Sequence, residues 1–199
     1  MASNEELIFN KLQEVYPSSI KEITELSFND ADNRNFIECT NLGFDFDTVN
    51  NANLINNNEK KEKSPDAIFC NNQTLHFVEF KEGKHKKEDI RLKIHESNAT
   101  LFFFCQKYLP EISRTDFFQL KITFTLIHRV RDNRGTMFTS AMEALVTLHN
   151  LGNLDGYIIQ KNNVVSFPRS VLNTLRRITG DKQLSINLHQ RDGTIVPLA

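Results

Sequence analysis

The chain opens with a helical pattern. Ser3 followed by Glu6 forms a capping box, in which each side chain accepts from the other residue's backbone N–H. Apolar residues then recur at intervals of three and four positions, at Leu7, Ile8, Leu12, Val15 and Tyr16. This spacing predicts a helix over 4–16, and Pro17 is expected to end it.

The hydrophobic pattern weakens from 18 to 63. Within it, FIECTNLGFDFDTVNN favours one or two short strands, and the polar run 50–63, rich in Asn and Lys, is typical of a loop. Two apolar runs follow, Asp66–Cys70 and Thr74–Lys81, and the Asn-rich break between them predicts a β-hairpin.

Helical and strand patterns alternate in the rest of the chain. A helix is predicted from about Lys86 to Tyr108, before Pro110, and the β-branched and aromatic residues of Asp116–Val130 predict a strand. The last elements expected are a helix over Thr136–Asn150, short strands in GYIIQ and NVVSF, and a helix over Ser170–Ile178 closed by Gly180. This alternation over 1–199 is typical of a single α/β domain whose central sheet is flanked by helices.

The composition is that of a globular protein: 199 residues, of which 39% are apolar and 25% charged. The longest apolar run, LFFFC, is far too short to cross a membrane, and the N-terminus lacks the pattern of a secretory signal. Three widely spaced cysteines form no metal or redox motif. We therefore expect a cytoplasmic protein with no membrane contact.

The net charge of −1 hides a local cluster of basic residues. It comprises Lys81, Lys84, Lys86, Lys87, Arg91 and Lys93, and it is either a nucleic-acid-binding surface or a solvated face.

The hairpin places charged residues in a strand that is apolar on both faces. With side chains alternating along the strand, Glu79 and Lys81 share one face, where a buried charge is costly unless it is paired. If Cys70 pairs with Leu75, Asp66 stands opposite Glu79; a tighter loop sets Asp66 opposite Phe77, a diagonal neighbour of Glu79. In either register two carboxylates and a lysine converge.

Such a cluster suits phosphodiester hydrolysis. Carboxylate oxygens bind Mg²⁺, which retains several waters. The metal lowers the pKa of a bound water and neutralises charge on the phosphate. A neighbouring ammonium can orient that water or stabilise the transition state.

These residues resemble the signature of the PD-(D/E)xK nuclease superfamily. Pro65-Asp66 matches the "PD", and Glu79-Phe80-Lys81 matches the "ExK". The resemblance implies a restriction-endonuclease-like core with a mixed sheet, over about 4–150, followed by a C-terminal extension over 151–199. It implies that Asp66, Glu79 and the Phe80 carbonyl bind Mg²⁺, for which Mn²⁺ can substitute, and that Lys81 is the catalytic lysine.

The resemblance and the patterns add further candidates. Lys93 and Ser97 lie on the apolar stripe of the helix after the motif; we expect them to reach the site, although Lys93 can equally snorkel at the margin of the stripe. Glu6 is either an accessory metal ligand or only a member of the capping box. Asp45 and Asp47 are weaker candidates for extra acids. The residues expected to contact nucleic acid are Lys84, His85, Lys86, Lys87 and Arg91.

The expected function is that of a Mg²⁺-dependent nuclease, an endonuclease of the restriction, phage-defence or toxin type, with DNA favoured over RNA as substrate. The alternative is a catalytically inactive nuclease-like module that binds nucleic acid or a protein. The resemblance leaves open a homodimer, which cutting both strands often requires, and a regulatory or immunity protein as partner.

Overall fold

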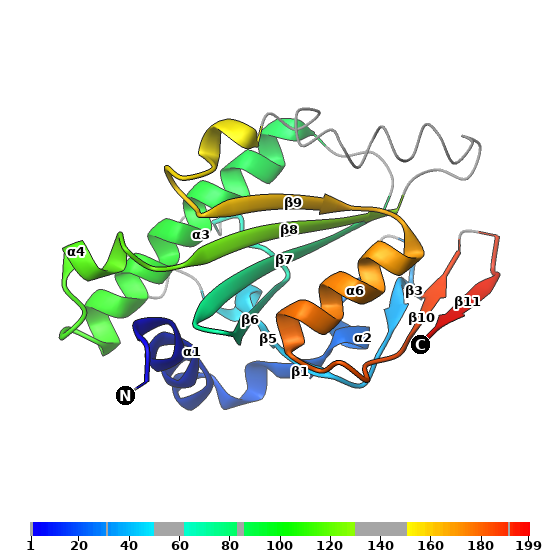
Figure 1. Cartoon of the computed structure of the whole chain (residues 1–199), viewed down its shortest axis with the longest axis horizontal. Helices are drawn as coiled ribbons and strands as arrows, with labels where there is room; N and C mark the ends of the chain where they lie inside the picture. Colours follow the sequence, from blue (N-terminus) through cyan, green and yellow to red (C-terminus); the bar gives the residue numbers. More distant parts are fainter. Residues whose placement is uncertain (1, 31, 50–61, 83–85, 130–150, 191) are drawn as a thin grey trace.

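A computed structural model describes residues 2–30, 32–49, 62–82, 86–129, 151–190 and 192–199 (Figure 1). Its centre is a six-stranded mixed sheet in the order β1-β5-β6-β7-β8-β9. The strands are β1 (Ile20–Glu22), β5 (Leu42–Asp45), β6 (Ala67–Asn71), β7 (Thr74–Glu82), β8 (Ile122–Arg129) and β9 (Lys161–Val165). Pairing is antiparallel from β1 to β7, and β8 and β9 continue in parallel with β7.

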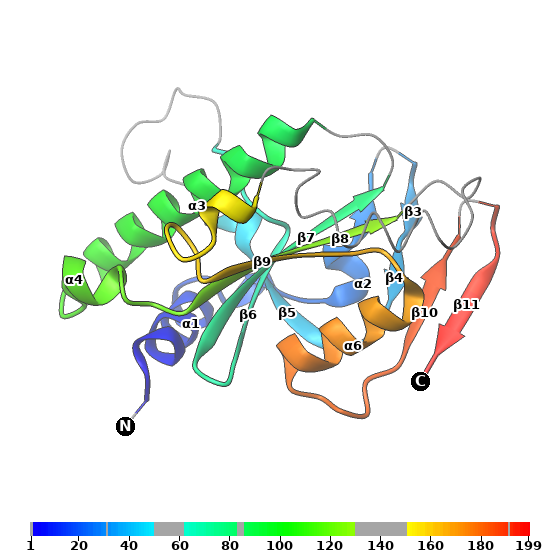
Figure 2. The same cartoon turned by 45° about the horizontal axis from the view of Figure 1, so that its top comes forward.

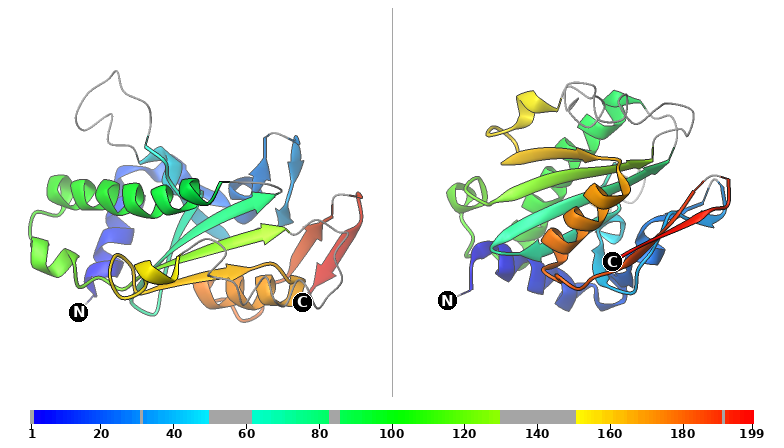
Figure 3. Two further views of the ribbon diagram at one scale, coloured as in Figure 1. Left: turned by 90° about the horizontal axis from the view of Figure 1, so that it is seen from above. Right: turned by 45° about the vertical axis from the view of Figure 1, so that its right-hand side comes forward.

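Helices cover both faces of the sheet (Figure 3). On one face, α1 (Asn4–Val15) and the long α3 (Lys87–Tyr108) pack on Phe44, Leu75 and Phe77, with the short α4 (Arg114–Phe117) at the far end of α3. On the other face, α2 (Ile23–Leu26) and α6 (Pro168–Thr179) pack on Val78 and Phe80. The expected α/β class and the mixed central sheet flanked by helices are therefore confirmed.

Two small sheets lie beside the main one. The strands β2 (Phe28–Asn29) and β3 (Arg34–Asn35) form a ribbon, and β4 (Ile37–Glu38), β10 (Ile186–His189) and β11 (Ile195–Leu198) form a three-stranded sheet. Through it the C-terminal strands lie beside the early part of the chain (Figure 2). Single 3₁₀ turns occur at η1 (Pro17–Ser19), η2 (Phe46–Thr48) and η4 (Gly152–Leu154).

Most predicted elements are present, with two corrections. The first part of 116–130 is not a strand: the capping box of Ser113 and Asp116 begins α4, and the strand begins only at Ile122. GYIIQ forms a turn with a single bridge between Asp155 and Ile159. The expected helix over 136–150 lies outside the described residues. The expected extension 151–199 contributes β9 to the sheet and α6 to its cover.

Within the described ranges, no helix is both long enough and apolar enough to cross a membrane.

Candidate active site

The β6–β7 hairpin has the register that sets the two acids opposite each other. Asn72 and Gln73, at φ 49° and 54°, form a two-residue turn in which both residues are left-handed, and Cys70 pairs with Leu75. The pairing continues to Ala67 and Val78. One residue further along the same register, Asp66 stands opposite Glu79.

The β7 strand is buried on both faces, as its sequence predicts. Phe77 belongs to the hydrophobic core under α3, and Val78 belongs to the core under α6. Glu79 lies on the α3 side with no exposed surface. Leaving such a carboxylate unpaired would cost several kcal/mol, so the contacts of Glu79 matter for stability as well as for chemistry.

Four charged side chains form the site cluster, which we define as Asp66, Glu79, Lys81 and Lys93. Lys81 Nζ lies 3.0 Å from Glu79 Oε1, and Lys93 Nζ lies 2.6 Å from Glu79 Oε2. Lys93 Nζ is also 3.7 Å from Asp66 Oδ1, so its ammonium bridges the two carboxylates. Lys93 thus reaches the site from α3, as expected from the sequence.

The two carboxylates of the cluster are held by different partners, a backbone N–H for Asp66 and an ammonium for Glu79. The backbone N–H of Phe80 donates to Asp66 Oδ2 over 2.6 Å. Glu79 Oε1 is buried and pairs with the Lys81 ammonium over 3.0 Å, and this contact helps to raise the pKa of Lys81. Each oxygen of Glu79 therefore contacts an ammonium, and a metal ion would have to displace one of these lysines or share an oxygen with it.

The pKa values of Asp66 and Lys81 are both raised, with opposite consequences for their charge at neutral pH. Burial, and then the adjacent Glu79 carboxylate, raise the pKa of Asp66 to about 8. Burial works to lower the pKa of Lys81, but the contact with Glu79 outweighs it and the pKa is raised. Lys81 is accordingly charged at neutral pH, while Asp66 is poised to exchange its proton for another cation.

An acidic cleft of about 260 Å³ opens beside Asp66. Asp45 in it pairs with Lys21 at 2.7 Å, and Asp47 accepts a hydrogen bond from the Ser64 hydroxyl. The full lining is Lys21, Glu25, Leu26, Phe28, Asp30, Asp45, Asp47 and Asp66. Glu25 and Asp30 were not foreseen, because they come from α2 and the β2–β3 turn, whose packing has no signature in the sequence.

A second buried ion pair lies on the opposite face of β7. Glu82 Oε1 is 2.6 Å from Arg129 Nη1 on β8, and both side chains are almost fully buried. Asn29 and Arg34 of the β2–β3 ribbon also contact Glu82. Period-two alternation places Glu82 away from Glu79, so this pair fixes the end of the strand without joining the site cluster.

Two expected site residues have hydrogen-bond partners outside the site cluster. Glu6 completes the capping box with Ser3, and its charge contributes to the raised pKa of Cys70, at the opposite end of β6 from Asp66. Ser97 donates to the Ile94 carbonyl within its own helix, the usual outcome for a buried helical serine. A role for these two residues at the site stays a prediction, and for Glu6 the capping box is the contact that the structure gives.

The expected nucleic-acid contacts are described only in part. Lys84 and His85 lie outside the described residues, Lys86 is exposed just before α3, and Lys87 is the first residue of that helix. The side chain of Arg91 donates to Asn153 over 2.7 Å.

The donor set fits a hard divalent cation under one condition. In the described part of the chain, no group of three or more His, Cys, Asp or Glu side chains is arranged to hold a metal. Mg²⁺, however, commonly binds through one or two carboxylates and completes its shell with waters and phosphate oxygens. Asp66 and Glu79 are such a pair, provided that the Lys93 ammonium withdraws from between them.

Comparisons with protein-family models, with curated proteins and with solved structures find no match to this chain. The resemblance to the PD-(D/E)xK superfamily therefore depends on the hairpin residues and on the order of the elements around them.

Proposed function

We propose that the chain is a metal-dependent nuclease that hydrolyses phosphodiester bonds, with DNA as the favoured substrate. The observation that carries the proposal is the convergence of Asp66, Glu79 and Lys81 at one buried strand end, where Glu79 Oε1 pairs with the Lys81 ammonium over 3.0 Å. The order of elements also supports a restriction-endonuclease-like core: a helix, an antiparallel meander β5-β6-β7, the crossover helix α3 and the parallel strand β8.

In this function Asp66 and Glu79 would hold Mg²⁺, and by the resemblance the Phe80 carbonyl would join them. Mg²⁺, when bound, acidifies a water and neutralises charge on the phosphate. Lys81 supplies a fixed positive charge, since its pKa is raised and its ammonium is held by Glu79, and such a charge stabilises a phosphate as negative charge builds up. Without metal, Lys93 neutralises Glu79 and lies near Asp66, whose raised pKa suppresses its own charge; a bound metal would take the place of the ammonium.

The acidic cleft supports a requirement for a divalent cation. Among the described residues that line it, Glu25, Asp30, Asp45 and Asp47 are acidic and Lys21 alone is basic, so the cleft would repel a phosphate backbone brought up without counter-charge. A site with this lining is therefore expected to bind nucleic acid at Asp66 only when a metal is present.

The test is a cleavage assay on single- and double-stranded DNA and on RNA, with Mg²⁺ or with EDTA. We expect EDTA to abolish cleavage and Lys81→Met to slow it by roughly 10²–10³-fold, the loss typical for one preorganised electrostatic group. Lys11→Met is the matched control, because Lys11 pairs with Glu14 on α1, away from the site. Titration of Mn²⁺ by calorimetry on the folded Lys81→Met protein should still detect binding, since an ammonium is no ligand. Full cleavage by Lys81→Met would refute the assignment.

One observation favours the alternative of a catalytically inactive module. Lys93 lies between Asp66 and Glu79, where a cluster that never binds metal would carry its own cation. An inactive module predicts no binding heat when Mn²⁺ is added to the wild-type protein and no cleavage with any metal. A nuclease predicts a binding heat with Mn²⁺ and cleavage with a divalent metal.

A further inference from the structure

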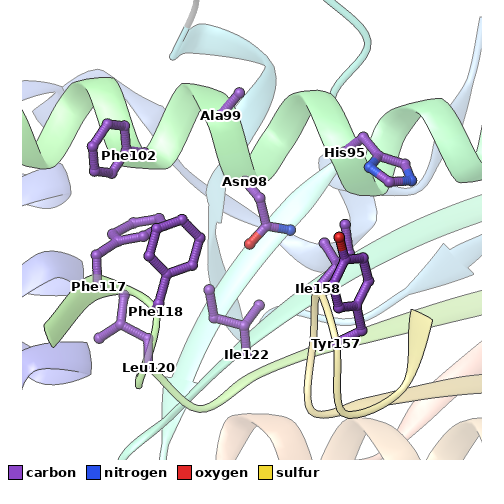
Figure 4. A pocket seen from close by; sticks show the side chains of 10 residues that line it. All are labelled: His95, Asn98, Ala99, Phe102, Phe117, Phe118, Leu120, Ile122, Tyr157 and Ile158. Atoms are coloured by element: carbon purple, nitrogen blue, oxygen red, sulfur yellow. The ribbon is translucent and has the colours of Figure 1, made fainter. Parts of the chain in front are cut away.

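A second cavity, of about 350 Å³, opens between α3, α4 and the segment that follows η4 (Figure 4). Its volume is at the lower end of the range of small-molecule sites. None of the four residues of the site cluster lines it. The cavity is therefore a separate feature, and no part of the proposed phosphodiester chemistry accounts for it.

Aromatic rings stand at both ends of this cavity. Phe117 and Phe118 lie at one end, where the Phe102 ring is 5.1 Å from Phe117 and stacks at 6.5 Å on Phe118. Tyr157 lies at the other end (Figure 4). Phe118 is 70% exposed and Tyr157 is 82% exposed. Large aromatic side chains left this exposed around one cavity mark a binding surface.

A polar group lies between the two aromatic ends. The carboxamide of Asn98 projects from α3 into the cavity (Figure 4). Its Nδ2 donates to the Ile94 carbonyl over 2.8 Å, and within the described chain its Oδ1 accepts no hydrogen bond. One N–H and the carbonyl oxygen of the amide are thus available to a ligand, and His95 adds an imidazole on the same helix.

We propose that this cavity binds a nucleobase. A base offers a planar face for the aromatic rings and, on its edge, adjacent donors and acceptors that match a carboxamide. A purely hydrocarbon ligand would leave Asn98 unpaired. A phosphate is disfavoured because, among the described residues, no lysine or arginine lines the cavity. The base belongs either to a free nucleotide or to an unpaired position of a nucleic-acid strand.

The test measures binding in EDTA, so that it does not depend on cleavage. The probes are the common nucleoside 5′-monophosphates, a short single-stranded oligonucleotide, inorganic phosphate, and N-acetyl-phenylalanine amide as a stand-in for a peptide side chain. We expect Tyr157→Ala to weaken binding of the monophosphates or the oligonucleotide by roughly 5- to 150-fold. Asn98→Leu should weaken it by about tenfold and change the preference among bases.

Phe103→Ala is the control, because Phe103 is a half-exposed aromatic residue of α3 that does not line the cavity. Its affinities should equal those of the wild type. Binding of monophosphates identifies a free nucleotide, and binding of the oligonucleotide alone identifies a base within a strand; either supports the proposal if Tyr157→Ala and Asn98→Leu weaken it.

Three results would overturn the proposal. The first is that neither the monophosphates nor the oligonucleotide binds. The second is that they bind but are insensitive to Tyr157→Ala. The third is that N-acetyl-phenylalanine amide binds as tightly as any nucleotide and is unaffected by Asn98→Leu, which would assign the cavity to a protein partner. Because Tyr157 is largely exposed, Tyr157→Ala is expected to fold. If Asn98→Leu fails to fold, Tyr157→Ala alone still decides the test.

Discussion

Lys93 is either a permanent structural counter-ion of Asp66 and Glu79 or a cation that a metal can replace. One substitution distinguishes these two roles. Without metal, Lys93→Met removes the partner of Glu79 Oε2 but leaves Lys81 on Oε1, so the free energy of unfolding should fall by about 1–3 kcal/mol. If a metal can take the place of the ammonium, saturating Mn²⁺ should restore much of this loss, because a ligand that binds only the folded state stabilises it. Thermal melting with EDTA and with Mn²⁺ measures both effects.

Asp66→Asn is the control for that experiment. It keeps an acceptor for the Phe80 N–H but removes one carboxylate from the pair, so Mn²⁺ should stabilise it much less than Lys93→Met. Equal melting of Lys93→Met with and without Mn²⁺ would show that the lysine is a permanent structural counter-ion.

His76 should make stability fall in acid. It is buried beside Thr123, its Nδ1 2.7 Å from the Thr123 hydroxyl, and burial followed by the charge of Arg177 lowers its pKa to about 4. The unfolded chain, with a histidine pKa near 6.5, binds more protons between these two values, so the free energy of unfolding decreases as pH falls through that window.

The slope due to His76 should approach about 1.4 kcal/mol per pH unit. In His76→Asn, whose Oδ1 can accept from Thr123, the contribution should disappear from denaturant titrations between pH 4 and pH 6.5. His95→Asn, a change at an exposed histidine, should leave the wild-type slope intact. Identical pH profiles for wild type and His76→Asn would contradict the assignment.

The β6–β7 turn sets the register of the site and also contains strain. Gln73 is an ordinary L-residue at φ 54°, where glycine is preferred. Gln73→Gly should therefore raise the free energy of unfolding by about 0.5–1 kcal/mol, the relief of strain less the entropy cost of glycine. Gln119→Gly, at an exposed position without positive φ, should stabilise nothing. Equal effects of the two substitutions in urea titrations would contradict the idea of strain at Gln73.

The elements that sequence could predict are those whose signals are local. The capping box and apolar spacing predicted α1, and the apolar runs around Asn72 predicted the hairpin. Both registers that they allowed bring Asp66 close to Glu79, and the structure has the one in which Cys70 pairs with Leu75. The strands between 18 and 49 are too short for periodicity to identify, and their pairing is decided by distant residues, as when Leu188 pairs with Ile37. The strand propensity of Phe117 and Phe118 was overridden by the Ser113 cap.

The candidate site was predictable to the same extent. Alternation along β7 fixed the shared face of Glu79 and Lys81, and the stripe on α3 indicated Lys93. Ser97 lies on the same stripe but is satisfied by its own helix, which the spacing of residues does not distinguish. The cleft was missed in most of its lining because it is assembled from segments without regular periodicity.

Over the whole molecule, charge is balanced but unevenly distributed, with acids around Asp66 and lysines around the start of α3. If those lysines contact phosphates, reversing Lys86 and Lys87 to glutamate should weaken DNA binding. It should also reduce the slope of log affinity against log salt by up to about 2, because each lost phosphate contact removes roughly 0.9 from the slope. Binding is best measured in the Lys81→Met background, where the substrate is expected to survive.

Reversal of Lys161 and Lys182, both exposed, is the matched control, since it changes the net charge by the same amount at other positions. Only the Lys86/Lys87 pair should flatten the slope. Equal loss in both double variants would mean that total charge, and no local surface, governs binding.

The parallel pairing of β7 with β8 has a consequence for how the protein is made. All four members of the site cluster lie between Asp66 and Lys93, so a ribosome releases them together, before it has made β8. Yet the strand that carries Glu79 gains its second neighbour only after Ile122 has emerged, and that neighbour then pairs along the whole length from Leu75 to Glu82. Until then one edge of an apolar strand is open to wrong partners. The nascent chain should therefore depend on chaperones during this interval. The site should be shielded from water on this side only when β8 docks.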